Sequence, residues 1–313
     1  MKCLIIVDSL KYIKTDCFQS QLYSALQRGY DIKIVELQPL QIFKLKKSFV
    51  NIEKFDKVIS LLRLRTLYGQ VNRIADWLEG CPITIYDQDP WESYMDSSPY
   101  KGAYIMFREK LNVQQVCTTS VWWANRVSQD GLPAKFVRMG MNPEWCDHGP
   151  EFFERPLTLG YRGTLKDHRK IIFDKLRALD VGLEVSEERL SYVEYMAYLN
   201  QLKFFTHDES ELPFVCDGEL VPRSTGIWIK SIEVVSRGAF CLRDYHPEGE
   251  TYNISDLPLI RCYESCEEIP DIINDIQKSS STKLREMQIE TVRKIRKQYD
   301  WFEVAHTLIT GEA

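Results

Sequence analysis

The sequence predicts an α/β fold made of two lobes, each with a parallel sheet covered by helices. The chain has 313 residues, which fits two domains of roughly 150 residues each. Short apolar runs of the buried-strand type alternate with amphipathic segments of helical spacing. This alternation stops once, in a stretch without periodicity, and then starts again. Each half of the chain therefore predicts a sheet of its own.

The first lobe is predicted over residues 1–145. Its strands are expected at residues 2–8, 31–37, 57–64, 82–87 and 113–120. Its helices are expected at 18–29, 68–80 and 121–131, and each of them ends on a glycine. Strands that alternate with helices in this way pair in parallel through right-handed crossovers.

The stretch NPEWCDHGPEFFERP, residues 142–156, has three prolines, one glycine and no periodicity, so we expect it to link the domains. The second lobe is predicted over 155–299. Its strands are expected at 157–163, 182–186, 202–208 and 239–244, and its helices at 166–180, 192–201 and 228–238. The helix-rich segment 281–309 is long enough to cross back, which assigns residues 300–313 to the first lobe.

Composition excludes several classes of protein. Apolar residues make up 44% of the chain and charged residues 27%, as in folded globular proteins. The net charge of −5 lacks the electrostatic footprint of a nucleic-acid binder. No apolar run approaches the roughly 20 residues of a membrane helix. Scattered cysteines predict reduced thiols in a cytoplasmic protein, and the lysine-rich segment 43–49 suggests peripheral contact with a membrane as an alternative to a solvated loop.

A phosphate site is predicted where the strand 157–163 ends. Gly163 and Thr164 form the turn, and Lys166 and Arg169 follow at the start of a helix. Glycine lets the backbone approach an anion, the helix end offers free N–H groups, and arginine contacts two oxygens at once. The alternative is an ordinary solvated helix face.

The helix 228–238 predicts a second part of the same nucleotide site. Lys230 and Glu233 lie in this helix, where a carboxylate facing a ligand can accept both ribose hydroxyls. The alternative for Glu233 is a solvated helix position. A further phosphate-binding loop is predicted just before the helix, at Arg223, Ser224, Thr225 and Gly226.

The motifs GTLKDHR and KSIEVVSRGAFCLRD resemble the carboxyl-terminal half of GT-B glycosyltransferases, in particular the spore-maturation-protein type of the group 1 transferases. They are similar, more distantly, to the phage DNA β-glucosyltransferase. The resemblance covers residues 155–300, and the first half by topology and the motif YDQDP. It implies two Rossmann-like lobes whose parallel sheets face a cleft, with a nucleotide sugar held mainly by the second lobe.

The resemblance also implies roles for single residues. Gly163 would be the turn glycine, Lys166 and Arg169 would contact the diphosphate, and Glu233 would bind the ribose. Many retaining members have another glutamate eight positions before the ribose ligand. Thr225 stands at that position here, which argues against a retaining reaction and leaves an inverting one as the alternative.

Asp87 and Asp89 lie in the motif YDQDPW at the end of a predicted strand. Two carboxylates at this spacing could hold a divalent cation on a diphosphate. The architecture implied by the resemblance places this strand end on the acceptor side, which favours a general base instead of a metal site. Either aspartate could be that base. The other interpretation is a turn and helix-cap pair, with Pro90 at the first helical position.

Together these observations predict a cytoplasmic, metal-independent glycosyltransferase without a cofactor. It would move a sugar from a nucleotide diphosphate sugar, with UDP favoured, to a hydroxyl of a glycan or lipid-linked saccharide. One alternative is a nucleotide-sugar-binding module without transfer activity, which has no use for Asp87 or Asp89. Another is a nucleic-acid base glucosyltransferase, which the negative net charge opposes.

Overall fold

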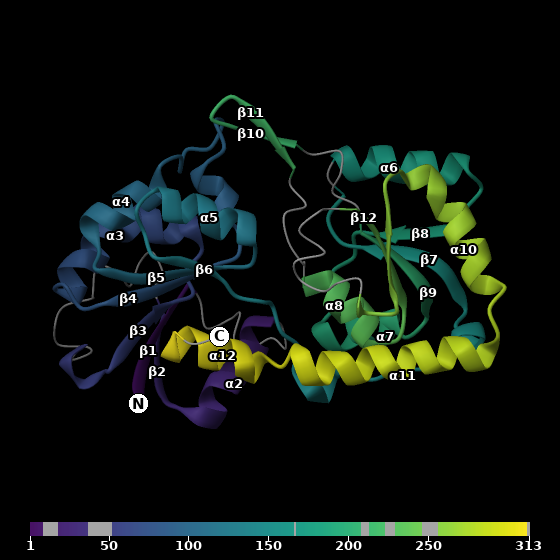
Figure 1. Cartoon of the computed structure of the whole chain (residues 1–313), viewed down its shortest axis with the longest axis horizontal. Helices are drawn as coiled ribbons and strands as arrows, with labels where there is room; N and C mark the ends of the chain where they lie inside the picture. Colours follow the sequence, from purple (N-terminus) through teal and green to yellow (C-terminus); the bar gives the residue numbers. More distant parts are fainter. Residues whose placement is uncertain are drawn as a thin grey trace. The chain divides into compact units, whose positions relative to one another are not determined.

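The computed structural model describes residues 1–8, 18–36, 52–165, 167–207, 213–222, 229–245 and 256–311 (Figure 1). The chain divides into two compact units. Unit 1 comprises Met1–Arg138, Phe214–Val221 and Trp301–Ala313, and unit 2 comprises Met139–Pro213 and Pro222–Asp300. Each unit contains one parallel sheet. No helix in the described part of the chain is both long enough and apolar enough to cross a bilayer.

The sheet of unit 1 has six parallel strands in the order β2-β1-β3-β4-β5-β6. Their bounds are β1 Lys2–Val7, β2 Asp31–Glu36, β3 Lys57–Ser60, β4 Ile83–Asp87, β5 Val113–Thr118 and β6 Ala134–Phe136. The central strands β3 and β4 are buried along their whole length, as expected for a parallel sheet covered on both faces. The strand order reverses beside β1, so β1 and β3 flank the switch point of this sheet.

Within the described residues, five helices cover this sheet: α2 Phe18–Gly29, α3 Leu64–Leu78, α4 Ala103–Lys110, α5 Val121–Gln129 and α12 Trp301–Thr310. Helices α3, α4 and α5 lie on one face, and α2 and α12 on the other (Figure 1). Helix α3 buries Leu67, Val71, Ile74 and Leu78, which recur at helical spacing. It begins earlier than predicted, inside the segment assigned to the preceding strand. The described part of unit 1 also contains the short 3-10 helices η2 Ile52–Lys54 and η3 Pro90–Ser93.

The sheet of unit 2 has five parallel strands in the order β13-β12-β9-β7-β8. Their bounds are β7 Leu157–Arg162, β8 Leu183–Ser186, β9 Leu202–His207, β12 Phe240–Asp244 and β13 Ile260–Tyr263. The chain leaves β7 for β8 on one side and then returns to β9 on the other. The carboxyl ends of β7 and β9 therefore flank the switch point of the second sheet, where ligands bind in open α/β folds.

The described part of unit 2 contains the helices α6 Asp167–Ala178, α7 Tyr192–Leu199, α8 Ile229–Ser236, α10 Ile269–Gln277 and α11 Ser281–Gln298. It also contains the short 3-10 helices η4 Pro143–Trp145, η5 Phe152–Glu154 and η7 Cys266–Glu268. Helices α7, α8 and α11 lie on one face of the sheet and α6 on the other (Figure 1). Helix α8 thus packs between the sheet and α11.

A hairpin from the second half of the sequence belongs to unit 1. Its strands are β10 Pro213–Cys216 and β11 Glu219–Pro222, joined by Asp217 and Gly218 with φ angles of 53° and 81°. Two left-handed residues of this type form the tight turn that matches the twist of a hairpin. The carboxylate of Asp96 accepts hydrogen bonds from the backbone N–H groups of Asp217 and Gly218, and Lys101 pairs with Asp96 and Asp217. These contacts fasten the turn to unit 1.

The aperiodic segment 142–156 lies within unit 2 and is held there by arginine side chains. Arg155 is 1% exposed, and its guanidinium donates to five carbonyl oxygens, those of His148, Pro150, Leu199, Leu202 and Arg237. Burial lowers the pKa of Arg155 to about 10. The Arg155 guanidinium crosslinks segments that are far apart in the sequence, because it donates hydrogen bonds to carbonyl oxygens from each of them. Without Arg155, these buried acceptors would lose their donor.

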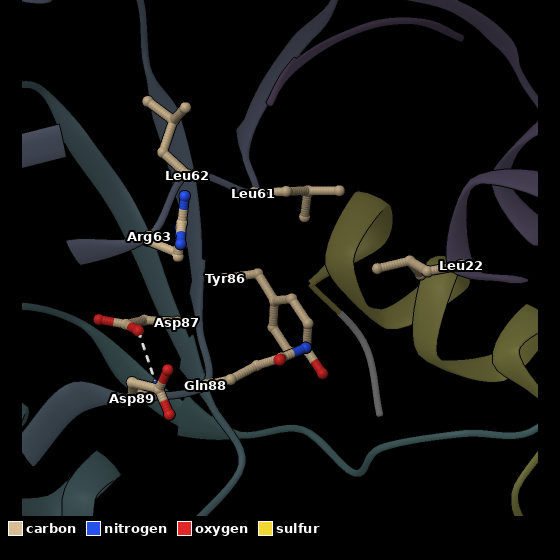
Figure 2. Close-up of a pocket in the computed structure, with 8 residues that line it drawn as sticks. All are labelled: Leu22, Leu61, Leu62, Arg63, Tyr86, Asp87, Gln88 and Asp89. Atoms are coloured by element: carbon tan, nitrogen blue, oxygen red, sulfur yellow. Dashed lines mark hydrogen bonds between the residues drawn. The ribbon is translucent and has the colours of Figure 1, made fainter. Parts of the chain in front are cut away.

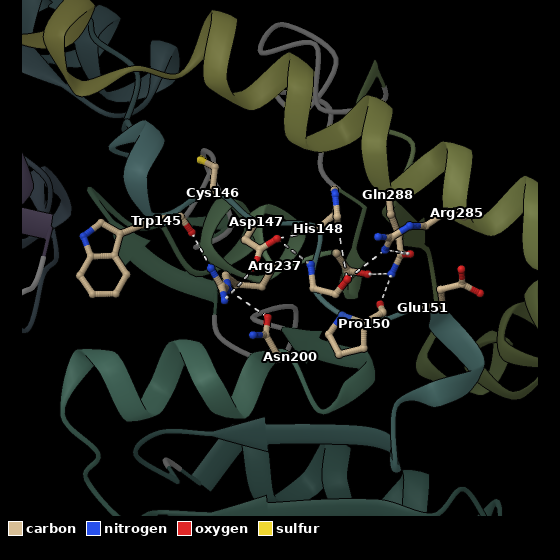
Figure 3. Close-up of polar contacts among 12 residues, drawn as sticks. Trp145, Cys146, Asp147, His148, Pro150, Glu151, Asn200, Arg237, Arg285 and Gln288 are labelled. Atoms are coloured by element: carbon tan, nitrogen blue, oxygen red, sulfur yellow. Dashed lines mark hydrogen bonds and ion pairs between the residues drawn. The ribbon is translucent and has the colours of Figure 1, made fainter.

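Arg237, which directly follows α8, makes a second set of these contacts (Figure 3). It donates to the carbonyl oxygen of Trp145 and to Asn200 Oδ1, both at 3.0 Å. Gln288 of α11 donates to the carbonyl oxygens of Pro150 and Gly238 at 3.2 and 2.9 Å. The segment predicted as a linker is therefore fixed both to the residue that follows α8 and to α11.

Candidate functional site

Among the residues that the structure describes, those predicted to bind phosphate lie at the carboxyl end of β7, beside the switch point of unit 2. Gly163 has a φ of 150°, and a Cβ atom there would lie 2.6 Å from Lys230 Nζ and 3.0 Å from Tyr161 Oη. Lys230, in the first turn of α8, donates to the carbonyl oxygen of Arg162 at 3.1 Å. The Gly163 turn and the Lys230 ammonium group thus lie in direct contact, as the absence of a side chain at Gly163 permits.

A second cation approaches the same turn from α6. Arg169 Nη1 donates to the carbonyl oxygen of Thr164 at 2.8 Å. The Arg169 guanidinium lies 5.5 Å from the centre of the Tyr161 ring, and Lys230 Nζ lies 5.0 Å from it. Tyr161 is buried and was not predicted, since its only signal is its place two residues before the turn glycine. Two cations from different helices therefore converge on one aromatic ring.

Several predicted residues lie outside the described part of the structure. They are Lys166 and the loop residues Arg223, Ser224, Thr225 and Gly226, together with the lysine-rich segment 43–49.

Glu233 lies one helical turn after Lys230, and its side chain is buried at 6% exposure. The interpretation of Glu233 as a solvated helix position is therefore wrong. Burial raises the pKa of Glu233 to about 7, and a hydrogen bond with Tyr192 and the charge of Lys230 oppose this rise. The Tyr192 ring in turn packs edge-on against Trp145, with ring centres 5.0 Å apart. A buried carboxyl with a raised pKa beside a cation is typical of a binding site.

The aspartates of the YDQDPW motif lie in unit 1, at the carboxyl end of β4 (Figure 2). Asp87 is 3% exposed, and both of its oxygens accept hydrogen bonds. Tyr104 Oη donates to Oδ2 at 2.7 Å, and the backbone N–H of Asp89 donates to Oδ1 at 2.9 Å. Burial raises the pKa of Asp87 to about 7, although these two hydrogen bonds lower it. Tyr104 was not predicted, because nothing local in the sequence connects it to β4.

Asp89 has a different environment. It is half-buried and occupies the N-cap position of η3, with Pro90 at the start of that helix. Its side chain makes no cap hydrogen bond. The predicted turn is therefore present, and the backbone N–H of Asp89 donates to the carboxylate of Asp87 in it. The Asp89 carboxylate does not cap the helix.

The Asp89 pocket, as we call it, lies at the carboxyl ends of β3 and β4 and has a volume of about 50 Å³. It has room for a few water-sized groups. Its lining residues are Leu22, Leu61, Leu62, Arg63, Tyr86, Asp87, Gln88 and Asp89 (Figure 2). Arg63 forms an ion pair with Asp8: its backbone N–H and its Nε both donate to Asp8 Oδ2, at 3.0 and 3.2 Å.

A metal site built by side chains would need several clustered ligands. Among the described residues, no group of three or more His, Cys, Asp or Glu side chains is placed to hold a metal ion. Asp87, one half of the predicted Asp-x-Asp pair, already uses both oxygens in hydrogen bonds within unit 1.

No family model matches the chain, and no curated protein matches its sequence. Solved structures match it over almost its whole length. HepE of Anabaena, in complex with UDP and glucose, matches with a TM-score of 0.62 and 11% identity, over 98% of each chain. Sucrose-phosphate synthase of Thermosynechococcus elongatus matches with a TM-score of 0.61 and 10% identity, over 98% of this chain and 97% of that one.

A third match is the DNA-modifying enzyme β-glucosyltransferase, with a TM-score of 0.58 and 11% identity over 99% of each chain. At such identities the likeness shows the fold. The predicted fold class is confirmed: the chain has the GT-B fold, with a covered parallel sheet in each unit.

Proposed function

We propose that the chain is a glycosyltransferase that moves a sugar from a nucleotide diphosphate sugar, UDP-sugar in the first instance, to a hydroxyl of a saccharide acceptor. The observation that carries this proposal is the convergence of Gly163, Arg169 and Lys230 at the switch point of unit 2. Proteins with the same fold, HepE among them, hold UDP and UDP-glucose in their structures. The acceptor in this proposal is a glycan or a lipid-linked saccharide.

In this proposal, unit 2 binds the donor. The turn at Gly163 and Thr164 lets the backbone approach the diphosphate, and Lys230 and Arg169 offset the charge that develops on it as it leaves. Glu233, in its ionised form, accepts hydrogen bonds from the ribose hydroxyls. Cationic side chains then supply the charge stabilisation that a metal ion supplies in other transferases.

Unit 1 supplies the general base, and we assign this role to Asp89. Asp87 is buried at 3% exposure, whereas Asp89 lines the pocket with a half-buried carboxylate. The Asp89 carboxylate takes the proton from an acceptor hydroxyl while that oxygen attacks the anomeric carbon. The bond from the anomeric carbon to the diphosphate oxygen breaks, UDP leaves with the bonding electrons, and the configuration inverts.

A thermal-shift panel of nucleotide sugars tests the donor site first. A ligand at 100 times its dissociation constant stabilises the protein by about 2.7 kcal/mol, a shift that is easily measured. Arg169→Ala should remove most of the shift with UDP-sugars. Lys170→Ala is the matched control, because Lys170 is the next residue of α6, is exposed and pairs with Asp167. Equal effects of the two variants, or no shift with any nucleotide sugar, would contradict the donor site.

Release of UDP, with and without saccharide acceptors, then separates a transferase from a module that only binds. Acceptor-dependent release supports the transferase. Tight donor binding without any release over a broad acceptor panel would instead favour the binding module.

A further inference from the structure

Among the residues that the structure describes, acidic side chains outnumber cations around the Asp89 pocket. Asp87 and Asp89 line it, and Glu92 follows in η3. The charges of Asp89 and Glu92 both act on Asp87, so the three carboxylates share one electrostatic environment. Of the lining residues that the structure describes, Arg63 is the only cation.

The charge of Arg63 is already offset. Its Nε and its backbone N–H both donate to one carboxylate oxygen of Asp8, whose side chain is 12% exposed. Asp8 directly follows β1, so its position is set by the strand. An anionic ligand in the pocket would therefore have to compete with Asp8 for Arg63 while facing the Asp89 carboxylate.

The other lining residues that the structure describes are uncharged. Leu22, Leu61 and Leu62 give the pocket apolar walls, and Tyr86 and Gln88 add a phenol and an amide (Figure 2). Apolar walls suit the C–H groups of a sugar ring, and a few polar groups suit its hydroxyls. The volume of about 50 Å³ fits one edge of such a ring, for example a hydroxymethyl or amino group.

We infer that the Asp89 pocket accepts an uncharged or amino-bearing polyol and rejects a polyol that carries a carboxylate or phosphate at the same position. This inference rests on the proposed function, because it names the class of acceptor for the proposed transfer.

The test uses the full chain and the UDP-sugar that the thermal-shift panel selects. Four matched acceptors are compared: a methyl hexoside, its 6-amino derivative, its 6-phosphate and the corresponding uronate. The kcat/KM values of the two anionic acceptors should be at least about 10-fold below that of the neutral one, equivalent to about 1.4 kcal/mol. The amino derivative should match or exceed the neutral acceptor. Equal or better use of an anionic acceptor would overturn the inference.

A pair of variants tests the cause of the selectivity. Asp8→Asn removes the carboxylate that offsets Arg63, so use of the uronate relative to the neutral hexoside should rise by about 10-fold, or 1.4 kcal/mol. Asp56→Asn is the matched control, because Asp56 also accepts a backbone N–H, that of Lys2, and does not line the pocket. An unchanged ratio in Asp8→Asn, or the same change in Asp56→Asn, would contradict the role of Arg63 and Asp8.

Binding measured by saturation-transfer NMR keeps the inference independent of turnover. With the native protein, the neutral and amino hexosides should give saturation-transfer signals, and the uronate should give weak ones. The Asp89→Ala variant should not give the signals of the neutral and amino hexosides. Binding of the uronate as tight as that of the neutral hexoside, or binding of none of the four, would overturn the inference. Selective binding without transfer would instead count against the proposed transferase.

Discussion

The phenol of Tyr104, in α4, donates a 2.7 Å hydrogen bond to Oδ2 of Asp87, at the end of β4. Both side chains are buried. The other oxygen of Asp87 accepts from the backbone of Asp89, so one buried carboxyl connects a helix with the loop that carries the proposed base. Burial raises the pKa of Asp87 to about 7. We therefore expect Asp87 to hold Asp89 in place, and we expect its contribution to stability to depend on pH.

The stability of Asp87→Asn relative to the native chain should depend on pH. The folded-state pKa of about 7 lies above the ordinary value of 3.8, so between these pH values the folded state keeps a proton that the unfolded state has lost. Native stability is then lost as pH rises through this interval, and the loss levels off above it. The asparagine variant lacks this loss, since its Oδ1 can accept from Asp89 while Tyr104 accepts from its amide.

Melting temperatures measured across that interval check this prediction. The difference between variant and native chain should grow in favour of the variant as pH rises. Glu233 also has a raised pKa, but it is present in both proteins and cancels in the difference. Parallel curves would show that Asp87 does not titrate with a raised pKa.

Asp89→Asn should lose turnover by roughly 100-fold to 10,000-fold, because an amide keeps the size of the side chain but cannot take the proton. The KM for the donor should stay unchanged, since the proposed donor residues belong to unit 2. Asp87→Asn serves as the comparison and should keep most of its turnover. NMR of the product should show the anomeric configuration inverted. A fully active Asp89→Asn, or a retained configuration, would exclude Asp89 as an inverting base.

Much of this site could be predicted because its signals are local. Asp87 and Asp89 stand in one motif after an apolar run, and Gly163 and Arg169 stand within seven residues of each other. Strand and helix periodicity likewise predicts most elements of both sheets. Tyr104 could not be predicted in the same way, because it lies in α4, a short helix of mixed charge and weak amphipathic pattern that the sequence does not indicate.

The hairpin shows a second limit. The Asp217-Gly218 pair is a strong hairpin signal that could have been used. Its packing in unit 1 depends on Asp96, more than 100 residues earlier, and on the ion pair with Lys101. Such long-range pairing leaves no periodic trace in the sequence, so the contribution of residues 214–221 to unit 1 follows only from the structure.

Glu233→Gln should weaken UDP-glucose binding by about 1–3 kcal/mol, because the amide offers one acceptor oxygen where the ribose hydroxyls need two. In the native chain, affinity for UDP-glucose should rise as pH increases through about 7, as Glu233 becomes ionised. UDP-glucose is suitable because its diphosphate has no proton to lose in this range. Isothermal titration at several pH values checks both expectations. If the UDP-glucose affinity of Glu233→Gln depends on pH in the same way as that of the native chain, Glu233 does not bind the ribose.

Transfer should survive chelation by EDTA, because cationic side chains offset the charge of the leaving diphosphate in the proposed mechanism. Initial rates are measured after dialysis against EDTA and again after manganese or magnesium is restored. Rates within about 2-fold of each other are expected, well inside the loss that removal of a catalytic metal causes. Complete loss, reversed by a divalent cation, would return Asp87 and Asp89 to the metal-site interpretation.

Gly163→Ala should weaken UDP binding by about 10-fold, or 1.4 kcal/mol, with a smaller effect on folding. Its φ of 150° strains any side chain, and the new Cβ would lie 2.6 Å from Lys230 Nζ. The tip of a lysine can move aside, so the protein should fold with Lys230 displaced from the turn. Gly182→Ala is the matched control, since Gly182 lies in the same unit with nothing within 4 Å of its Cβ position.

The cause of this loss can be read from a double-mutant cycle. If Gly163→Ala acts by displacing Lys230, it should cost little further UDP affinity in a Lys230→Ala background, and the two losses should fall well short of adding. If the alanine only blocks the approach of the diphosphate to the backbone, the losses should add. Additive losses would therefore show that Gly163→Ala does not act through Lys230. A loss of UDP affinity equal to that of Gly182→Ala would show that the turn does not bind the donor.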